Sequence, residues 1–137
     1  MVDILFQKIT IIRSQKPGSK NLNDELKWFG SSLGLFGLRD KDKSCYRVFV
    51  ELLKNTKQGK QMTSDDLAYK LQLSRGTVVH HLNRLMEQGI VMNTHNKYVI
   101  RVNDLTVLVT ELERDIERAF QDLREVAEQI EKGMGMK

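Results

Sequence analysis

Four side chains of the stretch "SRGTVVHHLNRLMEQGI" (74–90) fall on one face of a helix that turns about 100° per residue: Arg75, Val79, His80 and Asn83. A second side of the same helix collects the apolar residues Val78, Leu82, Leu85 and Met86. An imidazole and a carboxamide can hydrogen-bond to base edges, and Val79 can contact a thymine methyl group, in a major groove that is wide enough for one helix. We therefore interpret the first face as a reader of double-stranded DNA.

Residues suited to phosphate groups flank this face. Helix N-termini favour anions because their N–H groups point at the ligand, and hydroxyl and guanidinium groups are common phosphate ligands. We expect this role for Ser74, Arg75, Thr77 and Arg84. A second group, expected to reach the adjacent minor groove or the DNA backbone, consists of His95, Asn96 and Lys97. Cationic contacts of this kind position a protein on DNA and make its affinity depend on salt.

Three helices and a hairpin are predicted to position these residues. The first helix precedes the cationic exit "KNTKQGK" and has the apolar face Cys45, Val48, Phe49, Leu52 and Leu53. A short helix with Thr63 or Ser64 as its cap follows, and its inward residues are Leu67, Ala68 and Leu71. Ser74 caps the recognition helix, predicted at 75–88, and Gly89 ends it. Runs of strand formers around His95-Asn96 predict a β-hairpin, the wing, over 90–102, with Arg101 near its stem.

The residue pattern of the C-terminal part predicts one long helix, which begins after a cap at Asp104 and ends at about Lys132. Its apolar seam advances in steps of three and four residues, which is typical of a coiled coil, and consists of Leu105, Leu108, Leu112, Ile116, Ala119, Leu123, Val126 and Ile130. At about 1.5 Å per residue this helix is about 40 Å long and outruns a core of this size. We expect the seam to join two copies of the chain as a homodimer.

The N-terminal part divides at the turn "SQKPGSKN", which contains the only proline. Before the turn, residues 2–12 have apolar residues at helical spacing, but "ITII" is equally rich in strand formers; we favour a helix formed by Val2, Leu5, Phe6, Ile9 and Ile12. After the turn, a second apolar stripe starts from Asn21 and contains Leu22, Leu26, Phe29, Leu33 and Phe36. Glycines interrupt this stripe, so we expect the second helix to form by packing on another element.

The order helix, short helix, turn, helix and hairpin is that of a winged helix-turn-helix. The segment "MTSDDLAYKLQLSRGTVVHHLNRLMEQGIVMNTHNKYVIRV" resembles the DNA-binding unit of ArsR/MarR-type transcriptional regulators, especially the small archaeal and bacterial winged-helix proteins. The resemblance covers about residues 43–103, and "LSRGTVVHHLNRLMEQGIV" is its most specific portion. We expect a mainly α fold with a small β-hairpin, organised as an N-terminal helical or interface segment (1–38), a DNA-binding domain (39–103) and a coiled-coil-like dimerisation helix (104–137).

Charge is divided unevenly along the chain. Residues 1–103 hold 17 Lys and Arg against 9 Asp and Glu, a net of +8, whereas residues 104–132 hold 4 against 9, a net of −5. A basic half of this kind suits a polyanion. The longest nearly uncharged run, "WFGSSLGLFGL", is shorter than the roughly 20 residues that span a bilayer, and one cysteine fits a reducing cytosol. We expect a cytoplasmic protein without membrane contact.

Metal binding, cofactor binding and catalysis are not predicted. His80 and His81 are adjacent, so they point about 100° apart on a helix and cannot chelate from one face; we expect His81 in the core and His80 exposed. Metal-sensing members of the resembled family carry cysteines in the helix before the recognition helix, where this chain has "SDDLAYKLQL". Cys45 lies on an apolar face and is expected to be a buried small hydrophobe. The acidic pairs at 40/42 and 65/66 have no catalytic partner in any motif, and we expect no enzyme.

Two functions remain open. The first is a homodimeric, sequence-specific DNA-binding regulator, most simply a repressor, with recognition helices in successive major grooves and a pseudo-palindromic site. The second is a winged helix that serves as a protein-interaction adaptor in a transcription or replication assembly. The polar face favours DNA, because an adaptor is expected to place apolar anchors there and Val79 is the only one. A small-molecule effector bound near Trp28, Phe29 and Phe36 is left open beside a plain core or interface role for these residues.

Overall fold

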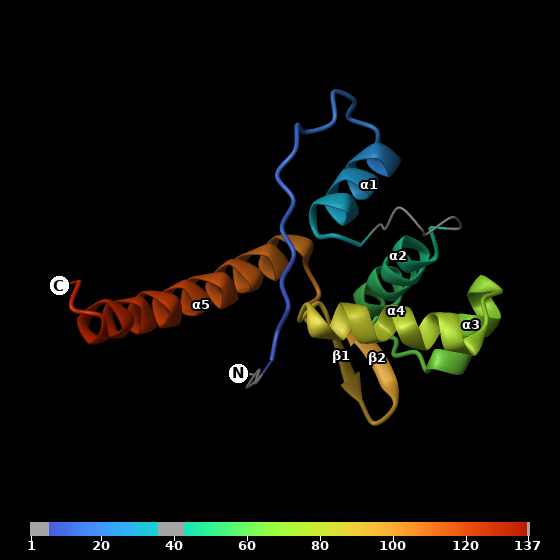
Figure 1. Cartoon of the computed structure of the whole chain (residues 1–137). Helices are drawn as coiled ribbons and strands as arrows, with labels where there is room; N and C mark the ends of the chain where they lie inside the picture. The colour runs from blue at the N-terminus through green and yellow to red at the C-terminus, as the bar shows by residue number, and fades with distance from the viewer. Residues whose placement is uncertain (1–5, 36–42, 137) are drawn as a thin grey trace.

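The computed structural model describes residues 6–35 and 43–136. Within these ranges the elements are α1 (Leu22–Ser32), α2 (Ser44–Lys57), α3 (Ser64–Leu71), α4 (Arg75–Glu87), β1 (Val91–Thr94), β2 (Lys97–Ile100) and α5 (Leu105–Gly133). Figure 1 shows a globular body made of α1 to β2, from which α5 projects with its C-terminal half clear of the other elements. The mainly helical architecture with one hairpin and a long last helix confirms the predicted winged helix-turn-helix.

One apolar core joins the body to the beginning of α5. The predicted inner faces of α2 and α4 are fully buried at Cys45, Val48, Phe49, Leu52, Val78, Leu82 and Leu85. The same cluster takes in Leu33 and Leu35 from the end of the α1 region and Leu108 and Leu112 from α5. The first turns of α5 are therefore fixed to the body by apolar burial.

Two capped N-termini define the helix-turn-helix. Thr63, not Ser64, caps α3: its Oγ1 accepts from the Asp66 N–H at 3.0 Å, and the Asp66 carboxylate accepts from the Thr63 N–H at 3.1 Å. Ser74 caps α4, and its Oγ accepts from the Thr77 N–H at 3.1 Å. Between the two helices Gln72 has a φ of 55°, in the left-handed region, which ends α3 and redirects the chain into α4.

The wing is a tight antiparallel hairpin. Val91 pairs with Ile100 at its stem and Thr94 with Lys97 at its end. His95 and Asn96 have φ values of 54° and 65°, the backbone of a type I′ turn. The turn therefore forms without the favoured Asn-Gly pair, since histidine and asparagine are among the residues that tolerate positive φ.

The predicted N-terminal helix over residues 2–12 is wrong for the part that the structure describes. Residues 6–12 have no regular secondary structure. The Lys8 N–H donates to the Glu87 carbonyl at 2.9 Å and the Ile12 N–H donates to the Ser32 carbonyl at 2.7 Å. These N–H groups bind other elements, so they are not available for a helical ladder; Val2 and Leu5 lie outside the described residues.

The second predicted helix is α1. Asn21 caps it by accepting from the Asn23 N–H at 2.8 Å and the Asp24 N–H at 3.3 Å. The helix ends at Ser32, two residues before Gly34, which has a φ of +71°. Leu33 is buried but Leu22 is 71% exposed, so the predicted stripe packs only at its C-terminal end, and Phe36 lies outside the described residues.

Helix α5 is the predicted long helix, and it uses its seam in two ways. Leu108 and Leu112 are buried in the core, whereas Leu123, Val126 and Ile130 are 62%, 52% and 54% exposed. Asp104 precedes the helix, but its side chain makes no capping hydrogen bond, so the predicted side-chain cap is not formed. In the described part of the chain, no helix combines the length and apolar character needed to cross a membrane.

Candidate nucleic-acid interface

Helix α4 separates its apolar and polar residues as the sequence predicts. Leu82 and Leu85 are fully buried on the inner face. On the outer face His80 and Asn83 are exposed and Val79 is half-buried. The three residues predicted to read bases are therefore at least partly accessible at the surface.

Three of the four residues predicted to contact phosphate gather at the N-terminus of α4. Ser74 Oγ donates to Thr77 Oγ1 at 2.8 Å while it accepts from the Thr77 N–H. Arg75 Nε lies 3.5 Å from an Asp65 carboxylate oxygen, and both side chains are about three-quarters exposed, at 73% and 74%. Exposed ion pairs contribute little free energy, so Arg75 can exchange this carboxylate for a phosphate at small cost.

Arg84, the fourth predicted phosphate contact, lies apart from the other three. Its guanidinium is half-buried, and Nη2 donates to the Gly34 carbonyl at 3.1 Å. This hydrogen bond joins α4 to the chain that follows α1. Sequence spacing placed Arg84 on the flank of α4 correctly, but it gave no signal for the carbonyl that the side chain binds.

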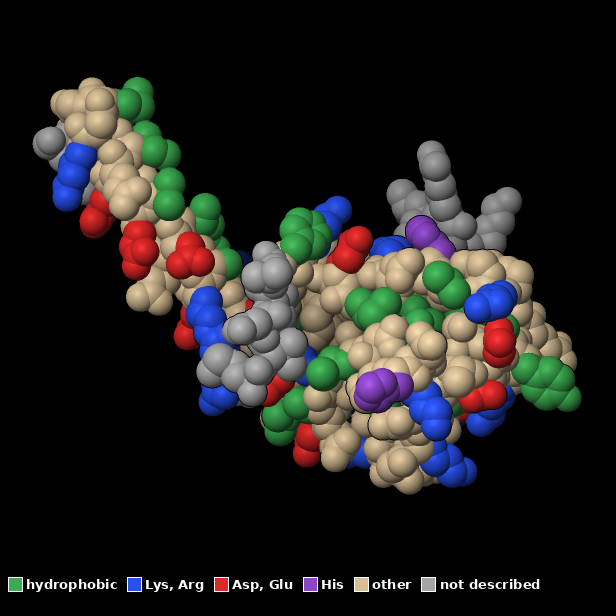
Figure 2. All heavy atoms as spheres, turned by 90° about the horizontal axis from the view of Figure 1, so that it is seen from below, with side chains coloured by type: hydrophobic (Ala, Val, Ile, Leu, Met, Phe, Trp, Pro, Cys, Tyr) green, Lys and Arg blue, Asp and Glu red, His purple; other side chains and the backbone are tan. Residues whose placement is uncertain are grey.

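The tip of the wing presents polar and cationic side chains. His95, Asn96 and Lys97 are all exposed. Figure 2 looks from the side toward which the hairpin points in Figure 1 and shows histidine together with Lys and Arg side chains on this face of the body. The second predicted contact group is thus brought to one exposed tip.

An ionic cluster at the stem of the wing was missed by the sequence reasoning. Arg101 Nη1 lies 2.6 Å from Asp115 Oδ2, and Arg101 Nε lies 2.8 Å from Glu111 Oε2. Gln7 Nε2 donates to the same Asp115 oxygen and to the Gln88 carbonyl, each at 2.9 Å. The cluster connects the wing, α5, the end of α4 and the N-terminal segment. The only signal in the sequence was the pair of acidic residues four positions apart on α5.

The Asp115 carboxyl stays ionised in this cluster. Burial alone would raise its pKa, but hydrogen bonds from Arg101 and Gln7 and the charge of Arg101 lower the pKa below its usual value of 3.8. The hydrogen bond with Asp115, together with the charges of Asp115 and Glu111, raises the pKa of Arg101 despite its partial burial. Both members of the pair are therefore charged at neutral pH.

The two adjacent histidines differ as predicted. His81 is 6% exposed, with its Nε2 2.6 Å from Ser44 Oγ, whereas His80 is exposed. Cys45 is fully buried, as expected for a small hydrophobe. Within residues 6–35 and 43–136, no group of three or more His, Cys, Asp or Glu side chains is arranged to hold a metal ion.

The fold and this surface define a winged helix-turn-helix whose recognition helix has an open polar face. Residues 50–92 match the model of the family described as "Bacterial regulatory protein, arsR family". The match runs from α2 through α3 and α4 into β1, about a third of the chain, and identifies this segment as a helix-turn-helix of the ArsR type, a DNA-binding fold of transcription regulators. No curated protein and no solved structure matches the chain.

Proposed function

We propose that the protein is a homodimeric regulator that binds specific double-stranded DNA sequences through α4 and the wing. One observation carries the proposal: the inner face of α4 is core, whereas its outer face, with His80 and Asn83, is exposed, as is the wing tip with Lys97. A face of this shape and polarity fits a major groove. The simplest regulatory outcome is repression, in which the bound protein occupies a promoter. The expected location of the protein is the cytoplasm.

The contacting residues have separate roles in this proposal. Val79, His80 and Asn83 read base edges, because they occupy the centre of the open face. Phosphate contacts come from Ser74, Arg75 and Thr77 at the N-terminus of α4 and from the wing tip, His95, Asn96 and Lys97. Arg84 belongs with these phosphate contacts too: its Nη2 donates to the Gly34 carbonyl, and a guanidinium has five N–H donors, so this one hydrogen bond leaves others for a phosphate.

Selection of bound duplexes from a random pool, at two salt concentrations, tests the proposal. We expect an inverted repeat to be enriched, because two recognition helices related by a two-fold axis read the same half-site twice. Asn83→Ala should relax the base preference within each half-site, since it removes one pair of hydrogen-bonding groups.

Lys97→Ala tests the phosphate contacts. It should lower the slope of log affinity against log salt by about 0.9 for each protomer that loses a phosphate contact, with little change in sequence preference. The matched control is Arg114→Ala, which removes one positive charge from an exposed position on α5. A pool without an enriched sequence, or equal binding by all of these variants, would contradict the assignment of this surface.

A further inference from the structure

The N-terminal segment, residues 6–12, lies against the C-terminal end of α4. The last carbonyls of a helix have no partner within the helix, and here two of them bind this segment. The Glu87 carbonyl accepts from the Lys8 N–H and the Gln88 carbonyl accepts from Gln7 Nε2, each at 2.9 Å. Figure 1 shows the segment passing the end of α4 from which the chain continues into β1. The backbone of Lys8 is therefore fixed beside the last turn of the recognition helix.

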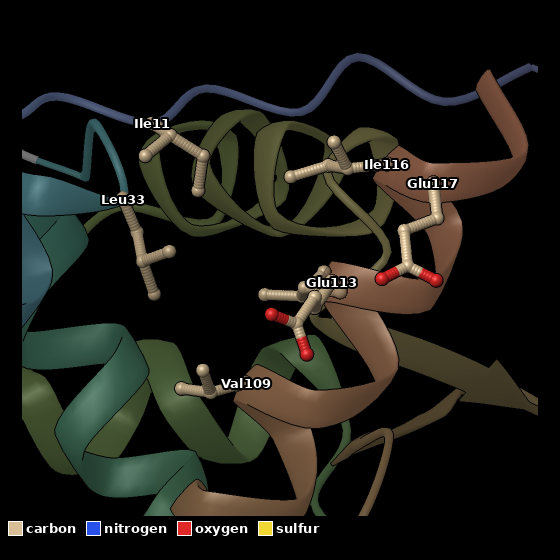
Figure 3. Close-up of a pocket in the computed structure, with 7 residues that line it drawn as sticks. Ile11, Leu33, Val109, Glu113, Ile116 and Glu117 are labelled. Atoms are coloured by element: carbon tan, nitrogen blue, oxygen red, sulfur yellow. The ribbon is translucent and has the colours of Figure 1, made fainter. Parts of the chain in front are cut away.

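Contacts that follow Lys8 in the sequence also hold the segment in place. The Ile12 N–H donates to the Ser32 carbonyl at 2.7 Å. Figure 3 shows Ile11 pointing from the segment into an apolar pocket of about 370 Å³ beside α5, which Leu33 also lines. Lys8 thus extends from a segment that is attached on both sides of it.

A small polar pocket lies between this segment and α4. It has a volume of about 90 Å³, and its lining residues are Lys8, Thr10, Arg84, Glu87 and Gln88. At about 30 Å³ per water molecule this volume holds about three of them, which is close to the space that one phosphate group occupies. Ammonium, guanidinium, hydroxyl and carboxamide groups all donate hydrogen bonds to oxygen, so the lining suits an oxyanion.

The two cations of this pocket are available to a ligand. Lys8 is exposed, and neither Lys8 nor Arg84 forms a salt bridge with another described residue. One of the five N–H donors of Arg84 binds the Gly34 carbonyl, which orients the guanidinium and leaves other donors. Two positive charges against the one negative charge of Glu87 leave a net of +1. The pocket therefore favours a singly charged anion such as a phosphodiester.

We propose that Lys8 and Arg84 together bind one phosphate of the DNA backbone, so that the N-terminal segment forms part of the DNA-binding surface. The inference rests on the proposed binding of α4 in a major groove. It adds a contact from a segment that lies outside residues 50–92, the part of the chain that matches the family model.

The position of the pocket around α4 fits this contact. At about 100° per residue, Arg84 lies about 100° from Asn83, the centre of the reading face, and about 20° from Thr77, two turns earlier. A helix with its side chains is about as wide as the major groove, so residues at this angle meet the phosphates along the wall of the groove. Thr77 and the pocket then face the same wall.

A second role is open to the same cations. Positive charges near a helix C-terminus stabilise the helix dipole, and this role requires no ligand. The two roles differ in what they change. Loss of the dipole interaction lowers the Tm, whereas loss of a phosphate contact lowers the affinity for DNA and its dependence on salt.

Binding of a random-sequence duplex, measured by fluorescence anisotropy over a range of salt concentrations, tests the contact without a known operator. Lys8→Gln should weaken binding about tenfold per protomer, the loss typical of a hydrogen bond to a charged group, whereas Lys8→Arg should bind as the wild type does. Lys8→Gln with Arg84→Gln should lower the slope of log affinity against log salt by about 0.9 per bound protomer, because the two cations share one phosphate. A fall of about 1.8 would mean two separate phosphates and would overturn the shared site.

Two further variants make the test specific to the pocket. Lys16→Gln is the matched control, because it removes an exposed positive charge from the turn that follows the segment, and it should leave affinity and slope nearly unchanged. Glu87→Gln removes the negative charge from the pocket but keeps the backbone carbonyl that binds Lys8. It should tighten binding several-fold, and an unchanged affinity would contradict a phosphate beside Glu87.

The outcomes separate this contact from the proposed function. Wild-type affinity and slope in Lys8→Gln, with a lowered slope in Lys97→Ala, would overturn the N-terminal contact and leave the proposed function standing. No binding of the duplex by the wild type at low salt would overturn both. A lowered Tm with unchanged affinity would assign Lys8 to the helix dipole and overturn the contact. A Tm that inorganic phosphate raises above its value in chloride at equal ionic strength, in the wild type but not in Lys8→Gln, together with unchanged duplex affinity, would assign the pocket to a free anion and overturn the contact with DNA. Circular dichroism of each variant shows whether it is folded.

Discussion

The ionic cluster at the stem of the wing allows a quantitative prediction, the effect of Arg101→Leu. The side chains of Arg101 and Asp115 are 12% and 5% exposed and their charged atoms are 2.6 Å apart, so the substitution leaves a buried carboxylate without its main partner. Breaking a buried pair on one side typically costs 3–5 kcal/mol. Gln7 still donates to Asp115 at 2.9 Å, so we expect the lower end, about 3 kcal/mol, and a Tm lowered by about 10 °C.

The matched control for this prediction is Arg118→Leu, which removes another guanidinium near the same carboxylate. Arg118 Nη1 lies 4.0 Å from Asp115 and its side chain is 56% exposed, so its loss should cost under about 1 kcal/mol. Urea unfolding followed by circular dichroism measures both variants. Equal destabilisation by the two substitutions would refute the reasoning, because it would mean that neither distance nor burial determines the strength of these contacts.

The destabilisation caused by Arg101→Leu should depend on pH. In the folded protein the pKa of Asp115 lies below its usual value of 3.8, so the ionised carboxylate contributes stability that is present above that value and lost as the pH falls through the lower, folded-state pKa. The difference in unfolding free energy between the wild type and Arg101→Leu should therefore be largest near neutral pH and shrink below about pH 4. A difference that stays constant from pH 7 to pH 3 would show that it arises from packing and not from charge.

Three further substitutions have distinct expected outcomes. Leu123→Asp should give a folded monomer by light scattering and circular dichroism, because Leu123 is 62% exposed. Leu112→Asp should unfold the chain, because Leu112 is 3% exposed. A folded dimer in either case would contradict the assignment of Leu123 to a dimer interface and of Leu112 to the core. Gly34→Ala should cost more than about 1 kcal/mol in thermal unfolding, since φ is +71° and the added Cβ would lie 2.7 Å from the Thr10 side chain. Thr63→Ala should cost about 1 kcal/mol by removing the cap of α3, and an unchanged Tm would show that the capping box is energetically silent.

Local signals in the sequence predict helix α4 and the hairpin well. The boundaries of α4 follow from a serine cap, a glycine stop and an apolar period, all of which act within a few residues of each other. The hairpin is likewise predicted from neighbouring residues, because strand formers flank two residues that accept positive φ. The exposure of His80 and the burial of His81 follow from the same periodicity.

Structure that depends on distant residues is not predicted. The backbone N–H of Lys8 donates a hydrogen bond to the carbonyl of Glu87, nearly 80 positions away in the sequence. The spacing of apolar residues in 2–12 does not indicate such a partner. Arg84 could be placed on a flank of α4, but not assigned to the Gly34 carbonyl. The α5 seam shows a related ambiguity, because its spacing is the same where Leu108 packs on the body and where Ile130 is exposed.

Long-range polar contacts connect the recognition helix, the wing and α5. Arg101 joins the stem of the wing to α5, and Gln7 bonds to Asp115 of α5 and to the carbonyl of Gln88 at the end of α4. The recognition helix is thus tied to α5 by hydrogen bonds as well as by the core. In the proposed dimer, pairing of the two α5 helices therefore fixes the separation and the relative orientation of the two recognition helices. If the proposed dimer binds DNA as we infer, the cluster at Arg101 should therefore influence recognition without contacting DNA, because it holds the wing and α4 in place relative to α5.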